Sequence, residues 1–182
     1  MIEIRSFLRD ETSELHRELD AIVGVFSSRS EYARFLQGTY RHRAPVEASL
    51  LNATAVGASS WRPRKLIPEL EADHADLALP LPTAEPFHLS NDMAAFLGAA
   101  YVLEGSALGA RVLVKGVGVL GFGPEHGARY LSVQGGSLDS WRTLLVALEG
   151  LDRQAWDVAA QAARAVFVHA IQAFTSEELS PA

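Results

Sequence analysis

The stretch IRSFLRDETSELHRELDAIV at residues 4–23 has the apolar spacing of an amphipathic helix. At about 100° per residue its large apolar side chains fall on one arc; they are Ile4, Phe7, Leu8, Leu15, Leu19 and Ile22. The same period recurs along the chain and predicts further helices near residues 30–50, 64–77, 92–115, 138–149 and 152–174. Only residues 111–119 have the β-branched content of a strand. The sequence therefore predicts an all-α fold.

Local signals place the ends of the longer helices. Ser30 is expected to cap the second helix and Pro45 to kink it. The residues Ser-Asn-Asp at 90–92 supply a cap for the long helix that follows. The proline-rich residues 80–90 and the glycine-rich residues 116–127 are expected to be the connections on either side of that helix.

The composition is that of one globular domain spanning residues 1–182, with 48% apolar and 21% charged residues. The net charge of −6 argues against nucleic-acid binding, and the absence of cysteine excludes thiol catalysis and cysteine-held clusters. Charges at Glu3 and Arg5 argue against a signal peptide. Glu104 interrupts the most apolar segment, residues 93–103, before it could span a bilayer. We therefore expect a cytoplasmic protein with no membrane and no nucleic-acid partner.

His16, at the edge of the apolar arc of the first helix, is the strongest candidate for a metal ligand. Asp20 follows one turn later and Arg9 precedes by two turns, so that the three residues lie within about 40° of one another. A carboxylate one turn away can accept the Nδ1 proton and leave Nε2 free for a metal. Arg9 lies about 10 Å along the same edge, which is the reach from a heme iron to its propionates. A half-buried histidine with a surface ion partner would show the same spacing.

The other histidines are weaker candidates. His42, between two arginines, is expected on a basic surface, and His74 and His88 are expected beside loops. His169 stands in an apolar segment and is interpreted as a core histidine, with a second metal ligand as the alternative. No histidine and carboxylate spacing matches a zinc or di-iron site.

Three glycines within the long helix, Gly98, Gly105 and Gly109, need an explanation, because each costs about 1 kcal/mol relative to alanine. Gly105 and Gly109 are one turn apart and expose the same strip of backbone. A flat ligand could lie against that strip, and the helix could kink there. Close packing of two helices would use small residues in the same way, and both interpretations stay open.

The run Gly116-Val-Gly118-Val-Leu-Gly121 matches the dinucleotide-binding pattern GxGxxG. That site requires a strand before the glycines and a helix that begins among them. Here Gly121 and the following Gly-Pro at 123–124 would break such a helix, and helical segments precede the run. A dinucleotide site is therefore not expected.

Two helical segments resemble those of one enzyme family. Leu8-Arg-Asp-Glu-Thr-Ser-Glu-Leu-His16 resembles the proximal helix of heme oxygenases, whose pattern is L-(R/K)-x-x-T-x-x-x-H. Tyr101-Val-Leu-Glu-Gly-Ser-Ala-Leu-Gly-Ala-Arg-Val-Leu-Val-Lys115 resembles the distal helix of bacterial members associated with iron acquisition and with bacteriophytochromes. The segments HGARY at 126–130 and WRTLL at 141–145 are weaker similarities to the same branch.

The resemblance implies a single-domain helical fold with heme between the proximal helix and a kinked distal helix. Heme would be both substrate and cofactor, and it would be cleaved to biliverdin, iron and carbon monoxide. Electrons would come from a ferredoxin or an NADPH-dependent reductase. A bacteriophytochrome that receives biliverdin is one implied partner, and iron acquisition is the other implied role.

By motif position the resemblance also implies roles for individual residues. His16 would be the iron ligand and Asp20 the acid that orients it. Arg9 and Lys115 would bind the propionates, with biliverdin IXα as the expected isomer. Gly105, Ser106 and Gly109 would form the distal, catalytic side. Many members carry Asp where this chain has Ser106, although the bacterial branch also has Ser, so that the water network near bound oxygen must be built differently.

Two alternatives from other classes share the fold. One is a heme carrier or sensor that never turns over, which would form a stable complex with oxygen under reductant. The other is a helical interaction protein without a cofactor, which would show no Soret band after heme is added.

Overall fold

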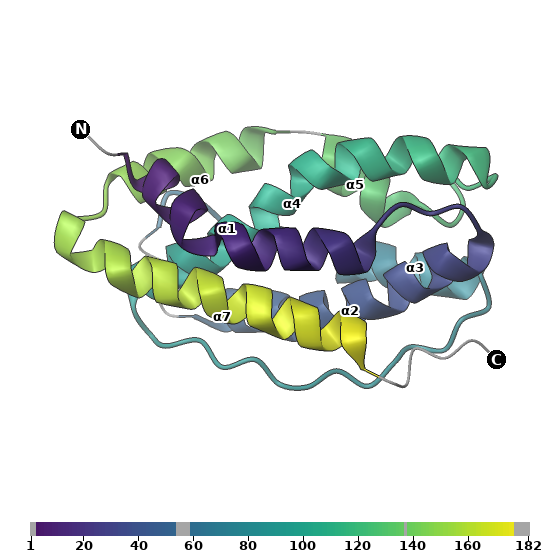
Figure 1. The fold of residues 1–182 in the computed structure, drawn as a ribbon, viewed down its shortest axis with the longest axis horizontal. Helices are drawn as coiled ribbons and strands as arrows, with labels where there is room; N and C mark the ends of the chain where they lie inside the picture. Colours follow the sequence, from purple (N-terminus) through teal and green to yellow (C-terminus); the bar gives the residue numbers. More distant parts are fainter. Residues whose placement is uncertain (1–2, 54–58, 137, 177–182) are drawn as a thin grey trace.

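The computed structural model describes residues 3–53, 59–136 and 138–176, and its regular structure is helical throughout (Figure 1). The helices are α1 (Ile4–Val23), α2 (Arg29–Asn52), α3 (Ile67–Asp76), α4 (Met93–Val119), α5 (Arg129–Gly136), α6 (Asp139–Glu149), the 3₁₀ helix η2 (Arg153–Ala155) and α7 (Trp156–Thr175). Within these residues no β-strand forms, and the β-branched stretch 111–119 lies in α4. The predicted all-α fold is confirmed.

Helix α7 is the element against which α1, α2 and α4 all pack. The ring contacts Phe7–Trp156 and His16–Phe167, each with centroids 5.6 Å apart, show that α1 and α7 run in the same direction side by side (Figure 1). The buried apolar residues of α1, α4, α6 and α7 form one core cluster together with part of α2. A second cluster joins α2 and α3 to α5 and the second half of α4. The two clusters hold α4 along its whole length.

The ends of α2 and α4 follow from their capping residues. Ser28, and not the expected Ser30, caps α2: its hydroxyl accepts from the backbone N–H of Glu31 at 3.2 Å, and the Glu31 carboxylate accepts from the Ser28 N–H at 3.0 Å. Only Ser28 has a glutamate three residues later, which is the capping-box spacing. Helix α2 runs on through Pro45 without interruption. Asp92, the last of the three residues expected to supply the cap, caps α4, because its carboxylate accepts from the N–H groups of the second and third residues of the helix.

Helix α4 is longer than expected and includes Gly116 and Gly118, so that the predicted start of the glycine-rich connection is wrong. Gly116 and Gly118 therefore lie in the last turns of a helix and Gly121 lies just after it, so that the run lacks the strand before the glycines and the helix beginning among them that a dinucleotide site requires. In Figure 1 the first half of α4 rises from the middle of the molecule and its second half runs along the upper edge. The change of direction falls in the middle of the helix, where the distal helix was expected to kink.

Helix α4 is also long and apolar enough, by length and composition alone, to cross a membrane. The expectation that Glu104 ends the apolar segment is wrong, because this residue is buried within the helix and pairs with Arg64. However, 67% of the most apolar window of α4 is buried inside the protein, which is the burial of a core helix.

Helix α5 was not predicted, and the reason lies in α3. The Asp73 carboxylate accepts from the backbone N–H groups of Arg129 and Tyr130, both at 2.9 Å, and so caps α5 from another helix. Asp76 accepts from the N–H of Gly127 in the turn before it. Because these caps come from residues more than 50 positions away, the local sequence of α5 carries no start signal.

Candidate functional site

The His16 imidazole has the geometry that its spacing predicts. Its Nδ1 lies 3.0 Å from Oδ2 of Asp20, and the side chain is 60% exposed. Its ring meets the ring of Phe167 on α7 edge to face, which fixes the plane of the imidazole from one side. Since the carboxylate accepts the Nδ1 proton, Nε2 is the nitrogen that can bind a ligand.

The contacts of α7 show which part of α4 lies level with His16 along the common direction of α1, α4 and α7. Position along this direction is called the height below. The backbone of Gly98 presses on Ala159 of α7, because a Cβ at this position would lie 2.7 Å from the Ala159 carbonyl carbon. Ser106 is eight residues after Gly98, and Phe167 is eight residues after Ala159. The two helices run in the same general direction, and eight residues rise about 12 Å in each (Figure 1). Phe167 contacts His16, so that His16 and Ser106 lie at about the same height.

One face of α4 changes from a helix contact to open space along its length. The four glycines Gly98, Gly105, Gly109 and Gly116 lie within about 40° around the helix axis. A Cβ at Gly98 would collide with α7, and a Cβ at Gly105 would lie 3.7 Å from the Trp141 ring. A Cβ at Gly109 or Gly116 would meet nothing within 4 Å. The two interpretations of the glycines thus separate: Gly98 serves helix packing, whereas Gly109 and Gly116 leave backbone open.

Apolar side chains flank this open backbone. Leu108, Val112 and Val119 are 46%, 67% and 89% exposed, although each is large and apolar. Val112 and Val119 project within about 60° of Gly116, and Leu108 lies beside them. An uncovered apolar surface next to bare backbone is typical of a ligand site. With the oriented His16 imidazole at the same height, this donor set and surface fit a heme.

Alanine substitutions at two of these glycines are expected to change the free energy of unfolding in opposite directions. Gly98→Ala forces the backbone of α7 to move, an overpacking that costs about 1–3 kcal/mol. Gly109→Ala fills open space and gains up to about 1 kcal/mol of helix propensity. Urea denaturation of the heme-free protein measures both values. Equal destabilisation by the two substitutions would show that Gly109 is also a packing glycine.

The two candidate cations lie at different ends of the site. Burial raises the pKa of the Tyr101 hydroxyl, and the positive charges of Arg5 and Arg9 oppose this, so that Arg9 lies toward the Tyr101 end of α4. Lys115 is exposed and comes fourteen residues after Tyr101, a rise of about 21 Å. Arg9 and Lys115 therefore lie on opposite sides of the height of His16, and the structure does not bring them together.

Tyr101 is a candidate that sequence reasoning missed. It is half-buried against Trp141, with ring centroids 5.5 Å apart, and it is one turn before Gly105 on the same side of α4. Its hydroxyl is a hydrogen-bond donor at the end of the site where Arg9 lies. The signal in the sequence was its spacing of four residues from Gly105.

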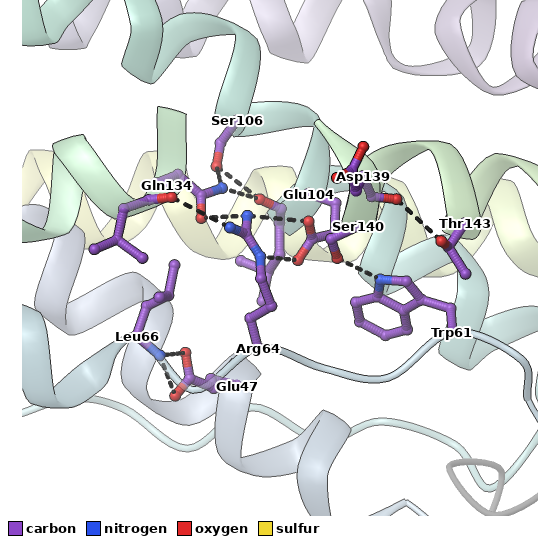
Figure 2. Close-up of polar contacts among 12 residues, drawn as sticks. Glu47, Trp61, Arg64, Leu66, Glu104, Ser106, Gln134, Asp139, Ser140 and Thr143 are labelled. Atoms are coloured by element: carbon purple, nitrogen blue, oxygen red, sulfur yellow. Dashed lines mark hydrogen bonds and ion pairs between the residues drawn. The ribbon is translucent and has the colours of Figure 1, made fainter. Parts of the chain in front are cut away.

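The Ser106 hydroxyl is part of a hydrogen-bond network that links three elements (Figure 2). It donates to the Leu103 carbonyl at 2.7 Å and accepts from Nε2 of Gln134 at 2.8 Å. Gln134 on α5 accepts in turn from Arg64 at 2.9 Å, and Arg64 forms an ion pair with the buried Glu104. No local sequence pattern predicts this network, because Arg64 and Gln134 are 70 residues apart and neither belongs to a local motif.

The histidine at position 42 and its neighbour Arg43 were placed wrongly. Arg43 is only 1% exposed and donates to the buried Glu47 at 2.9 Å. His42 Nδ1 lies 3.3 Å from Nδ1 of His169, so that the two form a pair between α2 and α7. Burial lowers the pKa of His42 to about 3, and the nearby His169 and Arg43 add to this effect. No group of three or more histidine or acidic residues that could hold a metal ion occurs in the described part of the chain.

His74 is buried within α3 and not beside a loop, since its Nδ1 donates to the Leu70 carbonyl at 2.7 Å. His88 is exposed in the connection before α4, as expected. His169 is half-buried, and its ring meets Phe87 edge to face. The contacts of His74 and His169 are structural.

His126, between α4 and α5, is exposed and pairs its Nδ1 with Asp76 at 3.4 Å. His16 is distinguished from it by its place on α1, beside Phe167 of α7.

No family model matches the chain. Two individual proteins and a solved structure to which it is similar are all heme oxygenases. The chain is 32% identical to heme oxygenase PigA of Pseudomonas aeruginosa over 148 residues, which are 78% of this chain and 75% of that protein. It is 32% identical to a heme oxygenase of Xanthomonas campestris pv. campestris over 120 residues, which are 65% and 72% of the two chains. Its fold is similar to the crystal structure of NO- and CO-bound heme oxygenase from Neisseria meningitidis, with a TM-score of 0.70 and 26% identity, covering 96% and 93% of the chains.

The likeness in structure extends over nearly the whole chain, so that the fold is that of the all-helical heme oxygenases. With this identity over three quarters of a relative's length, the chain belongs to the heme oxygenase family. It is an enzyme that degrades heme, and heme is both its substrate and its cofactor. Neither the fold nor the relatives favour a non-catalytic carrier, a sensor or a cofactor-free interaction protein.

Proposed function

We propose that His16 is the axial ligand of heme and that heme lies between α1 and the second half of α4. The observation that carries this proposal is the open backbone at Gly109 and Gly116, which begins near the height of His16. Asp20 holds the Nδ1 proton, so that the neutral Nε2 binds the iron. Gly105, Ser106 and Gly109 form the opposite, distal side.

When bound, heme supplies the activation of molecular oxygen and is itself cleaved to biliverdin, iron and carbon monoxide. The residues of this chain position that reaction. His16 binds without the electron donation of a thiolate. Gly105 and Gly109, which have no side chains, let the α4 backbone approach the distal side closely. The exposed Ser106 holds ordered water at its Oγ and delivers a proton from it.

Addition of heme and then of reductant to the purified protein tests this function. A Soret band and its conversion to the absorption of biliverdin are expected. A heme complex that stays stable with reductant and oxygen would instead indicate a carrier or sensor. The absence of any Soret band would indicate an interaction protein without a cofactor.

The positions of Arg9 and Lys115 lead to a proposal for how heme is oriented. Both propionates leave the same edge of a heme, and the two cations lie at opposite ends of the site. Arg9 with Tyr101 therefore binds the propionates in one in-plane orientation, and Lys115 stabilises a competing one. The pairing of a cation with a tyrosine hydroxyl favours the Arg9 end, with biliverdin IXα as the expected product.

Arg9→Ala is expected to lower the share of the IXα isomer and raise that of a second isomer. A charge-assisted pair contributes about 1.5–3 kcal/mol, which changes the ratio of two orientations by roughly 10- to 100-fold. Chromatography of the product measures the isomers. Lys115→Ala is expected to change the ratio in the opposite direction, and Arg17→Ala, an exposed α1 cation, to leave it unchanged. A dominant β or δ isomer in the unmodified protein would contradict the assignment.

We assign the remaining features to the same function. Electrons come from a separate ferredoxin or NADPH-dependent reductase, since the chain has no cysteine to hold an iron–sulfur cluster. Biliverdin is released in the cytoplasm, where a bacteriophytochrome is a candidate recipient. The whole chain, residues 1–182, forms one heme oxygenase domain, and the coverage of 96% in the structural comparison supports this.

A further inference from the structure

Gln134 on α5 belongs to no motif in the sequence, but it is hydrogen-bonded to the distal helix α4 at two positions. Its side chain is fully buried, and its Nε2 donates both to the Leu103 carbonyl at 2.9 Å and to Ser106 Oγ at 2.8 Å (Figure 2). Both acceptors lie in the turn of α4 that surrounds Gly105. Gln134 thus holds the turn that carries the distal strip.

Arg64 fixes which way the Gln134 amide points. Its Nη2 donates to Oε1 of Gln134 at 2.9 Å, and a guanidinium has only donors, so that the carbonyl end must face Arg64 and the NH₂ end must face α4. Arg64 is itself held by the Glu104 carboxylate, with Nη2 and Oε2 3.1 Å apart. Glu104 is 1% exposed, and the pair places no net charge in the core. The amide has one orientation as a result.

This orientation determines what the Ser106 hydroxyl can do. A hydroxyl has one proton to donate, and its oxygen already accepts from Gln134. The proton goes to the Leu103 carbonyl in this structure. Ser106 is exposed, however, and about 60° around the helix from Gly109, so that rotation of the hydroxyl directs the same proton to a ligand on the open side. A charged donor at the start of such a chain strengthens each hydrogen bond after it.

We propose that Gln134 and Arg64 are positioning residues of the distal site, which act through Ser106 by keeping its hydroxyl a hydrogen-bond donor toward the ligand on heme. The proposal rests on the proposed function in one respect, namely that Ser106 lies on the distal side. Neither Gln134 nor Arg64 touches heme in this arrangement. Their effect on the heme ligand must therefore disappear when the Ser106 hydroxyl is removed.

A double-mutant cycle between Gln134→Leu and Ser106→Ala tests the proposal. The measurement is the midpoint of the pH-dependent change in the ferric heme spectrum, because a donor aimed at the heme ligand favours its deprotonated form. Each single substitution is expected to raise the midpoint by about 0.5–1 pH unit. In the Ser106→Ala background, Gln134→Leu is expected to cause no further shift.

A purely structural role for Gln134 predicts a different pattern. Gln134→Leu would then lower the melting temperature of the heme-free protein in both backgrounds and leave the midpoint unchanged, or shift it equally in both. An unchanged midpoint, or an equal shift of the midpoint in both backgrounds, overturns the inference about Gln134. The proposed role of Ser106 is not affected by either result. If Ser106→Ala itself leaves the midpoint unchanged, the proposed role of Ser106 fails as well.

Gln134→Glu is the second variant, for use if Gln134→Leu does not fold. It keeps the shape and the contact with Arg64 but removes the Nε2 donor. The Ser106 hydroxyl would then donate to this carboxylate and not to the heme ligand, so that the midpoint is again expected to rise. An unchanged midpoint with Gln134→Glu overturns the proposal. Arg64→Lys keeps a cationic donor, and its spectral midpoint is expected to stay close to that of the unmodified protein.

Discussion

His16→Ala is expected to remove the axial ligand of the ferric heme complex and to reduce biliverdin formation by at least ~100-fold. The Nδ1 of His16 lies 3.0 Å from the Asp20 carboxylate on α1. His126 has a similar pair with Asp76 at 3.4 Å, but it lies between α4 and α5 and not on α1, so that it is not expected to take over this position. The absorption spectrum of the heme complex and the rate of biliverdin formation are the two measurements. Added imidazole is expected to restore both in part, because truncation leaves space for a free ring between Asp20 and the heme.

Two matched substitutions separate ligation from general effects on α1 and α7. Asp20→Asn keeps the shape but weakens the orientation of Nε2, and a loss of about 10- to 100-fold in heme affinity or activity is expected. His169→Ala removes a histidine that lies against His42 and Phe87, and it is expected to leave the heme spectrum as it is. If His16→Ala keeps the original spectrum while His169→Ala loses it, the assignment of the ligand is wrong.

The parts of the site that lie within one helix could be predicted from the sequence. His16 and Asp20 are one turn apart on α1, so that their contact follows from helix geometry alone. The spacing of Gly105 and Gly109 likewise predicts a shared face. The spacing alone does not show whether this face contacts a ligand or another helix, because that depends on what packs against it in the folded protein. The collision at Gly98 and the open space at Gly109 show that one face of α4 serves both purposes.

The parts that the sequence did not predict depend on side chains that act over long distances along the chain. Glu47 of α2 is an example: its carboxylate accepts from the N–H groups of Leu66 and Ile67 and so caps α3. Asp73 of α3 caps α5 in the same way, and Gln134 of α5 holds the distal turn of α4. Each of these contacts replaces a local cap or turn signal with a tertiary one. A reading of local patterns therefore missed α5 and, with it, the network behind Ser106.

The same chain of contacts has a consequence for the stability of the distal side. The start of α3 is hydrogen-bonded to the buried Glu47 of α2, and the start of α5 to the buried Asp73 of α3. Each carboxylate accepts from two backbone N–H groups, so that α5 is fixed relative to α2 and α3. Helix α5 in turn packs along the second half of α4, where Gly135 lies close to the backbone of Ala110 and Arg111. The turn of α4 that carries Gly109 is thus held from behind, while a Cβ at Gly109 on its front would meet nothing within 4 Å in the described part of the chain. This arrangement keeps the strip rigid without filling it.

Gly109→Leu is expected to lower biliverdin formation by at least ~100-fold while heme affinity falls only modestly. A side chain here would begin in space where its Cβ meets nothing within 4 Å, and we expect the protein to fold with it in place. It would then displace whatever occupies the distal side of a bound heme. The bond from His16 on the other side would be largely untouched, since α1 packs on α7 and α6. Heme then still binds, but the oxygen ligand can no longer reach the edge of the macrocycle that is normally cleaved. Peroxidase-like side reactions are therefore expected in place of ring opening.

Three measurements distinguish this effect from loss of structure. The melting temperature of heme-free Gly109→Leu is expected to stay near that of the unmodified protein, whereas Gly98→Ala, on the same face of the same helix, is expected to lower it. Titration with heme gives the affinity, and a single-turnover assay with reductant gives the yield of biliverdin. Ser106→Ala is expected to be milder than Gly109→Leu, because its hydroxyl is one member of a larger network. If Gly109→Leu turns over heme at the unmodified rate, the open face of α4 does not border the reacting side of heme, and its small residues have no part in the chemistry.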